Sequence, residues 1–528
     1  MNKKDFSLLP QVRFSRSRFH MPHGVKTSMN VGTLYPIHIQ EVLPGDSFKT
    51  VCSVVTRVSS AFLKPVLDTL WMDTYHFFIP YRLVYDDTEK VFGSASPSQY
   101  IQDNLVSFPS FATSVIVSEK TVFDYLGVMP GTVPPGLRIL EARAFALTYE
   151  KWFRNENVVN EVFVNKGAIV SSETPNNNAW GPTNYTGKLP QVSKRKDYFT
   201  SCLPKPQKGV PVQLGFASTA PVIMTTNTTA TDVVFGTPNG DKSRFAIGGG
   251  GYLETRIPAT GYTPNVVADL SNASAFDIND VRFKFQLQKM LERDSLYGGR
   301  YNEYLLAHYG VSNPDSRVQI PEYLGGARIP LTVTQVAQTS EGTSTSPQAN
   351  VAGYSLSGGK SQFNKGFTEH GFVLTVACIR TLHTYQQGIP KQFSRVARND
   401  FYDPLFANLG EMPVYTSELY VDPNATSLRD GIFGYNEAWA DYRMIQNRVS
   451  GEMRSSATNS LDIWHFGDNY ASTPTLSQSF VEETSSNVDR TLAVPSATQD
   501  QFICDFWFDT KAIRVMPTFS VPGLIDHH

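Results

Sequence analysis

Several separated stretches of the chain alternate with the two-residue period of a β-strand. Residues 71–82 place large apolar or aromatic side chains on both faces of such a strand, which predicts that it is covered on each side. Residues 371–385 and 500–519 share this pattern and are rich in β-branched and aromatic residues. Because these segments lie far apart in the sequence, we expect core strands of a sandwich joined by Greek-key-like return connections.

Two segments follow the helical period of about 3.6 residues instead. The first comes after the helix breakers at 134–136, and its apolar face consists of Phe145, Tyr149, Trp152 and Phe153. The second can be capped by Asp277 or Asn279, ends at the glycines 298–299, and carries the stripe Phe283, Leu287, Met290 and Leu291. We expect both stripes to pack against the sheet.

Two further segments have neither period. The first begins at Gly215 and ends at Ala275; seven of its 61 residues are charged and eighteen are Thr or Gly, which favours a small β module or surface insertion. The second, residues 335–366, is rich in Ser, Thr and Gly and predicts a mobile loop. The predicted domains are a basic N-terminal arm at 1–26, a first part of the core with an inserted helix at 27–214, the insertion at 215–275, and a second helix with the rest of the core at 276–528.

The composition limits the kinds of protein that the chain can be. Charged residues make up 18% of the chain, below the roughly 25% of globular proteins, and aromatic residues reach 12%. Such a surface suits a chain covered by neighbouring subunits, although a large ordinary β protein fits equally well. The four cysteines, Cys52, Cys202, Cys378 and Cys504, form no C-x-x-C pair, which is typical of buried thiols in a reducing compartment. No apolar run is long enough for a membrane span, so we expect a soluble protein made in a cytoplasm.

The charge is unevenly distributed along the chain, although the net charge is only −2. The first forty residues carry one acidic residue and six basic ones, which predicts a basic arm with an anionic partner. Phe14 and Phe19 alternate with arginines there, so their rings could stack on unpaired bases while the cations pair with phosphates. A solvated tail and a metal site at His20 and His23 are the alternatives, the latter disfavoured by Pro22. The candidate nucleic-acid-binding residues are Lys3, Lys4, Arg13, Arg16, Arg18 and Lys26.

No motif of catalytic chemistry stands out. The glycines at 248–251 are not followed by the Lys and Ser or Thr of a phosphate-binding loop, and no G-x-S-x-G or H-E-x-x-H sequence occurs. Paired carboxylates of a glycosidase cannot be recognised from sequence, because their separation depends on the fold. We therefore predict no catalytic residue, metal or cofactor, and keep a β-sandwich carbohydrate-binding module or glycosidase as the rival interpretation of the many aromatic residues.

Six segments, distributed in order from one end of the chain to the other, resemble the major capsid protein of microviruses, small tailless phages with single-stranded DNA. The similarity is greatest to the gokushovirus branch. The segments are 17–49, 72–84, 196–209 (with "LPKPQKG"), 321–326 ("PEYLGG"), 433–443 ("FGYNEAWADYR") and 520–528 ("SVPGLIDHH").

This resemblance implies a mainly β fold: an eight-stranded antiparallel jelly roll with large inter-strand insertions and a few helices. It further implies a T=1 icosahedral shell, assembled in the host cytoplasm, that encloses circular single-stranded DNA in the virion. The implied partners are further copies of the chain, a small basic DNA-binding protein, a pilot protein, an internal scaffolding protein and a host cell-surface receptor. The insertion at 215–275 matches the place of a threefold protrusion that contacts the host, without identifying receptor-binding residues.

Overall fold

The computed structural model describes residues 15–92, 106–176, 179–212, 278–337 and 351–519, together with the backbone of five short strands between residues 222 and 268. The chain divides into two compact units. The larger comprises Met1–Pro206 and Leu296–His528, and the smaller comprises Gln207–Ser295. The predicted insertion at 215–275 thus lies inside the smaller unit.

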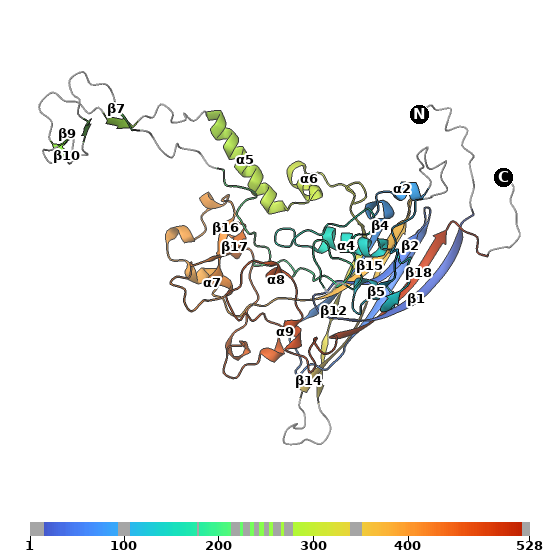
Figure 1. Cartoon of the computed structure of the whole chain (residues 1–528). Coiled ribbons are helices and arrows are strands. Elements are labelled where there is room, and N and C mark those ends of the chain that lie inside the picture. Colours follow the sequence, from blue (N-terminus) through green and yellow to red (C-terminus); the bar gives the residue numbers. More distant parts are fainter. Residues whose placement is uncertain are drawn as a thin grey trace, which may run out of the picture. The chain divides into compact units, whose positions relative to one another are not determined.

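The larger unit is built on two antiparallel sheets that share one apolar core (Figure 1). One sheet has the order β1 (Ser17–Met29), β18 (Phe502–Arg514), β3 (Ser47–Val58), β14 (Val351–Gly366), with the short β13 (Val333–Ala337) at its edge. The other has the order β12 (Glu322–Leu331), β4 (Leu70–Pro80), β15 (Gly371–Thr381), β2 (Tyr35–Val42). Strands distant in sequence are thus neighbours. Apart from the short β13, the eight remaining strands follow the order of a jelly roll, so the predicted mainly β sandwich is confirmed.

The burial of residues along β4, β15 and β18 can be compared with the apolar patterns in their sequences. β4 and β15 are covered on nearly every position, as their two apolar faces predicted. β18 is different, because only alternate residues such as Phe506 and Phe508 enter the core. Trp507 between them is 53% exposed, so the prediction that this strand is covered on both faces is wrong. All four cysteines are buried thiols.

The predicted loop at 335–366 is wrong for residues 335–337, which end β13, and for residues 351–366, which form the long strand β14. Its small residues misled the prediction, because they serve the packing between the sheets. Ser355, Ser357 and Ser361 point inward and are buried. A Cβ on Gly359 would come within 2.5 Å of Ile329 on β12, so only glycine allows this close approach.

Two long insertions interrupt the jelly roll, at 81–321 between β4 and β12 and at 382–501 between β15 and β18. In the larger unit, the first contains η1 (Tyr81–Leu83), α2 (Thr88–Val91), β5 (Val115–Val117), α3 (Val122–Tyr125), β6 (Gly131–Val133), α4 (Leu140–Thr148), η2 (Tyr149–Phe153) and α6 (Tyr301–Tyr309). The second contains η3 (Lys391–Ser394), η4 (Arg398–Asp400), η5 (Pro404–Phe406), β16 (Met412–Tyr415), α7 (Thr416–Leu419), β17 (Ile432–Asn436), η6 (Ala440–Tyr442), η7 (Gly451–Met453), η8 (Asp462–Trp464), α8 (Gln478–Val481) and α9 (Ser486–Asp489).

The smaller unit contains most of the second predicted helix, α5 (Ile278–Tyr297). Its strands pair locally: β7 (Val222–Met224) with β11 (Val266–Ala268), and β9 (Lys242–Ile247) with both β8 (Val233–Gly236) and β10 (Leu253–Arg256). The side chains Phe283 and Met290 of α5 are 66% and 42% exposed, so the expected burial of this stripe is wrong. By contrast, Phe145, Tyr149 and Phe153 of α4 and η2 are buried, as predicted, whereas Trp152 of the same stripe is 37% exposed.

Two buried ionic networks fix the insertions. In the first, Arg143 of α4 makes a bidentate pair with Glu173 at 2.8 and 3.0 Å, and neither side chain is exposed. In the second, His383 lies between Asp468 at 2.9 Å and Glu483 at 3.0 Å, with Lys194 within 3.6 Å of Asp468. One imidazolium and one ammonium thus balance two carboxylates.

The His383 network predicts a specific dependence of stability on pH. Burial alone lowers the pKa of His383, but Glu483 and Asp468 outweigh it and raise the pKa to about 10. Because the pKa is raised on folding, the stabilisation is complete below the unfolded pKa of about 6.5 and is lost as the pH rises towards 10. We expect His383→Gln to be destabilised most near pH 6, and by progressively less up to pH 10, in urea unfolding followed by circular dichroism. A difference between the two proteins that does not change with pH would contradict this.

Candidate assembly surface and nucleic-acid interface

The insertion at 382–501 exposes a group of large apolar side chains between residues 393 and 445. We call them the 393–445 surface. The most exposed are Val396, Leu405 and Ile445, at 88%, 89% and 96%. The remaining members are Phe393, Phe401, Tyr402, Phe406, Leu409, Tyr442 and Met444, all at least 40% exposed.

The backbone beneath this surface is firmly held. Trp439 has a left-handed backbone, with φ of 61°, which is rare for a bulky residue and costs roughly 1–3 kcal/mol. Its indole Nε1 donates to the carbonyl of Phe406 at 2.9 Å, and its ring lies 5.7 Å from that of Tyr402. Arg395 stacks 4.2 Å over the ring of Tyr442 and pairs with Asp441. The apolar side chains are therefore displayed on an ordered scaffold.

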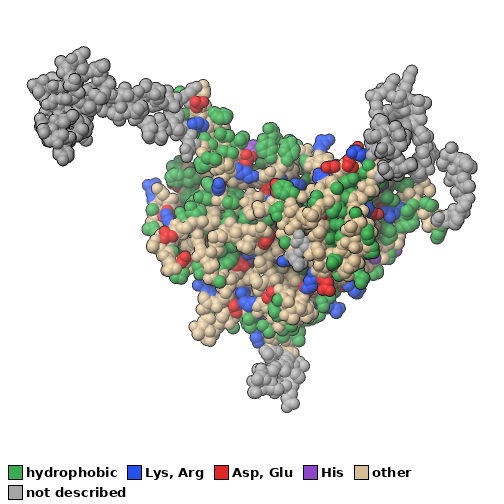
Figure 2. Space-filling model, viewed as in Figure 1, with side chains coloured by type: hydrophobic (Ala, Val, Ile, Leu, Met, Phe, Trp, Pro, Cys, Tyr) green, Lys and Arg blue, Asp and Glu red, His purple; other side chains and the backbone are tan. Residues whose placement is uncertain are grey.

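An ordered patch of this kind indicates a protein–protein contact. Soluble monomers rarely expose contiguous apolar patches of large size, and interface centres are rich in aromatic residues and poor in charge. Figure 2 shows, on the face in view, hydrophobic side chains over much of the surface with charged residues scattered between them. The 393–445 surface thus has the chemistry of an interface between protein chains.

The structure places only some of the predicted nucleic-acid-binding residues. Lys3, Lys4, Arg13 and Phe14 lie outside the described residues. Arg16 is exposed beside Gly45. Arg18 and Lys26 belong to β1, where they point outward from the sheet, and Lys26 lies 3.5 Å from Asp505 of β18. Residues 17–26 of the predicted arm are therefore part of an edge strand.

Strand geometry also corrects two expectations for β1. Phe19 points inward and packs against the cluster of Phe48, Phe78 and Phe367, so its ring is unsuited to stacking on bases. His20 and His23 lie on opposite faces of the strand because they are three residues apart. His20 contacts Asp509 at 2.6 Å, whereas His23 contacts His38 at 3.3 Å. The disfavoured metal pair is thus not formed.

Four further basic residues share the outward face of this sheet and were not predicted as candidates: Lys49, Arg57, Lys360 and Lys511. The exposed Trp507 lies on the same face. Their alternation with buried residues along β3, β14 and β18 was the available signal, but it identifies a common face only when the pairing of the strands is known.

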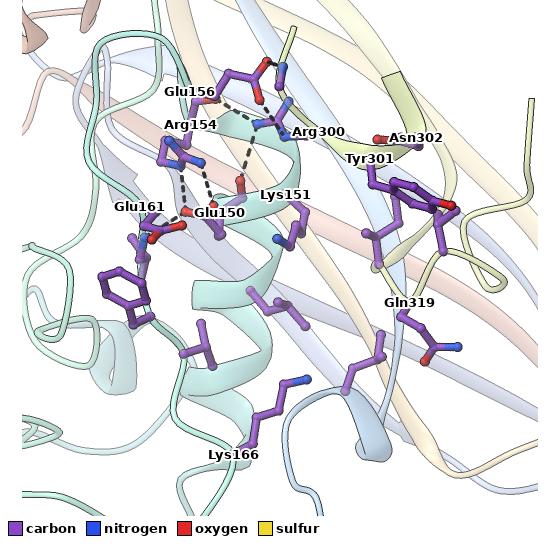
Figure 3. Close-up of a pocket in the computed structure, with 18 residues that line it drawn as sticks. Glu150, Lys151, Arg154, Glu156, Glu161, Lys166, Arg300, Tyr301, Asn302 and Gln319 are labelled. Atoms are coloured by element: carbon purple, nitrogen blue, oxygen red, sulfur yellow. Dashed lines mark hydrogen bonds and ion pairs between the residues drawn. The ribbon is translucent and has the colours of Figure 1, made fainter. Parts of the chain in front are cut away.

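The largest pocket described, of about 630 Å³, lies between η2, residues 161–166 and the segments at 299–302 and 318–320 (Figure 3). Two of its three acidic residues pair with arginines: Glu150 accepts two hydrogen bonds from Arg154, four residues further along the chain, at 2.7 and 2.8 Å, and Glu156 pairs with Arg300. Lys151 lines the same pocket, opposite Tyr301. The lining contains no histidine, cysteine or serine, so it provides no nucleophile–histidine pair.

The described residues include neither a candidate metal site nor a membrane-spanning helix. They contain no group of three or more His, Cys, Asp or Glu side chains suited to a metal ion. Among the same residues, no helix has the length and apolar character that crossing a membrane requires.

Comparison with known proteins gives a consistent result along the whole chain. A family profile described as "Capsid protein (F protein)" matches residues 7–524. The capsid protein VP1 of Spiroplasma virus 4 is 38% identical, over 98% of this chain and 97% of the relative. The proteins of that name from Bdellovibrio phage phiMH2K and Chlamydia phage 1 are 35% and 33% identical, each over 99% of this chain and 98% of the relative. The chain therefore belongs to the F-protein family of microvirus capsid proteins.

Proposed function

We propose that copies of this chain assemble into a T=1 icosahedral shell that encloses a circular single-stranded DNA genome, and that the chain catalyses no reaction. The observation that carries the proposal is the 393–445 surface, which a single chain leaves uncovered although its backbone is well ordered. Membership of a capsid-protein family supports the same conclusion. Electron microscopy of the purified assembly tests it.

The mechanism is geometric. A chain in a closed shell uses different surface patches around the fivefold, threefold and twofold axes. Around the fivefold and threefold axes the contacts are heterologous and close into rings, which requires only that the surfaces are complementary. The stiff jelly roll keeps the relative orientation of these patches fixed, while the two insertions carry most of the surface that varies. We place assembly of the shell in the host cytoplasm, and the assembled chain is then a component of the virion.

The contact with DNA is proposed from the charge of the N-terminal segment, and the other partners are proposed from the likeness to microvirus capsid proteins. The candidate DNA-binding cations stay those of the N-terminal segment, at positions 3, 4, 13, 16, 18 and 26, and many copies in a shell would compensate for weak binding by each. Since the net charge of the whole chain is −2, most genome neutralisation falls to a separate small basic protein. A scaffolding protein, a pilot protein and a host receptor complete the proposed set.

The rival function, carbohydrate binding or glycoside hydrolysis, is not favoured. Three glutamates line the pocket: Glu150, Glu156 and Glu161. Glu150 pairs with Arg154 and Glu156 with Arg300, so of these three only Glu161 is not engaged with an arginine among the described residues. A retaining or inverting glycosidase requires two carboxyl groups free to act on the sugar from opposite sides.

The smaller unit gives a prediction about host attachment. We expect deletion of residues 215–275, closed with a short Gly-Ser linker, to leave the sandwich folded and particles intact, because the β7–β11 strands pair only among themselves. Adsorption of the particles to host cells should be abolished, as measured by the fraction of particles left unbound. Normal adsorption by the deleted particles would contradict the assignment, whereas loss of particles would place the segment in assembly instead.

A further inference from the structure

The outward face of the sheet β1–β18–β3–β14 is open, and Trp507 lies at its centre. The indole is 53% exposed, although tryptophan is normally well buried. Its direct neighbours across the strands are Gly24 on β1 and Ser53 on β3. Because Gly24 has no side chain and Ser53 a small one, the ring is not enclosed by its neighbours; a Cβ on Gly24 would already lie 3.3 Å from it.

Positive charges outnumber acids on this face, although the charged residues nearest to Trp507 along β18 are Asp505 and Asp509. Lys49 and Lys511 are directly opposite each other on β3 and β18, an arrangement that destabilises a sheet through like-charge repulsion. Lys360 of β14 lies in the same cross-strand row as Trp507, next to Ser53. Among the described strand residues on this face, six are basic and two are acidic. The basic residues are Arg18, Lys26, Lys49, Arg57, Lys360 and Lys511, and the acidic residues are Asp505 and Asp509.

The two aspartates do not neutralise the lysine pair. Asp505 lies beside Lys26 at 3.5 Å, and Asp509 accepts from His20 at 2.6 Å. Lys49 and Lys511 therefore repel each other in the free protein and would both be stabilised by a bound polyanion. This charge complementarity distinguishes the face from the 393–445 surface, whose exposed residues are chiefly apolar.

We propose that this sheet face binds single-stranded DNA, with bases stacked on Trp507 and phosphates paired with Lys49, Lys511 and Lys360. The inference rests on the proposed function, which places a single-stranded genome inside the shell, and adds a site that the N-terminal arm does not include. An exposed aromatic ring among cations is the combination that holds unpaired bases without sequence preference. Paired bases of a duplex present no free face to the ring, so duplex DNA binds less well.

Binding of a fluorescein-labelled oligothymidine of about 20 nucleotides to the full-length chain tests this site. We expect Trp507→Ala to weaken binding by about tenfold and Trp507→Phe to restore most of it, because phenylalanine also stacks. The double variant Lys49→Gln/Lys511→Gln should reduce the slope of log affinity against log salt by about 1.4, which corresponds to two lost phosphate contacts. The matched control is Lys151→Gln/Lys166→Gln, which removes two cations from the pocket of Figure 3 and should change neither quantity.

Three results would overturn the site: unchanged binding by Trp507→Ala, equal losses in the pocket control, or equal affinity for a duplex of the same length. Electron microscopy of the same variants separates this inference from the proposed function. Shells that form normally but hold less DNA are expected for Trp507→Ala. Failure of these shells to form while oligonucleotide binding is unchanged would mean that the face contacts another copy of the chain.

Discussion

Replacing Glu173 by Gln is expected to lower the free energy of unfolding by about 3–5 kcal/mol. The substitution removes a charge but almost no volume, so the cost is electrostatic. Arg143 is completely buried, and its guanidinium would lose the only carboxylate that pairs with it among the described residues. Glu173 also accepts hydrogen bonds from the hydroxyl of Tyr185 at 2.5 Å and the backbone of Val170 at 2.9 Å. The loop that covers α4 would therefore loosen together with the ion pair.

Urea unfolding of the unassembled chain, followed by circular dichroism, measures this loss. The matched control is Glu161→Gln, the same substitution at an exposed position on the neighbouring segment, which should change stability by less than about 0.5 kcal/mol. A Glu173→Gln protein as stable as the control would show that the buried pair contributes nothing beyond packing.

The second large effect concerns assembly. We expect the double variant Leu405→Asp/Ile445→Asp to fold normally but to form no particles. In the single chain these side chains are 89% and 96% exposed, so charging them costs little. In an interface each aspartate would be desolvated without a partner, at a cost of several kcal/mol per ion that is repeated at every contact of the shell. Circular dichroism of the unassembled chain and sedimentation of the assembly reaction separate the two properties.

Conservative changes at the same positions provide the control. Leu405→Met/Ile445→Leu keeps the surface apolar and should assemble with a yield close to that of the natural chain. If the aspartate variant forms particles normally, the 393–445 surface is not a contact between copies of the chain.

Local patterns were sufficient to predict the buried strands and one helix. β4 and β15 carry apolar residues on both faces and α4 an aromatic stripe, and in each case the pattern reports burial directly. β14 was missed because its serines and glycines resemble a loop, whereas the close approach of β12 requires small residues there. The need for small residues arises from the contact between the two sheets, so it produces no periodic pattern of apolar residues in the sequence of β14 itself.

The candidate sites show the same limit. Arg18 and Lys26 were found because basic residues cluster in the sequence, but Lys49, Lys360 and Lys511 come from three distant strands that only the sheet order brings together. Phe19 was assigned to the wrong side because its orientation depends on which face of β1 enters the core. Residues of the 393–445 surface lie in short irregular segments, where sequence gives no means to separate buried from exposed apolar side chains.

Assembly into a shell can be tested by cryo-electron microscopy of the assembled chain, co-expressed with the proposed scaffolding protein. We expect uniform closed shells of T=1 icosahedral symmetry, in which the 393–445 surface is covered by a neighbouring copy of the chain. Particles from infected cells should contain DNA density. Discrete monomers or dimers under these conditions, or shells in which Leu405 and Ile445 face solvent, would contradict it.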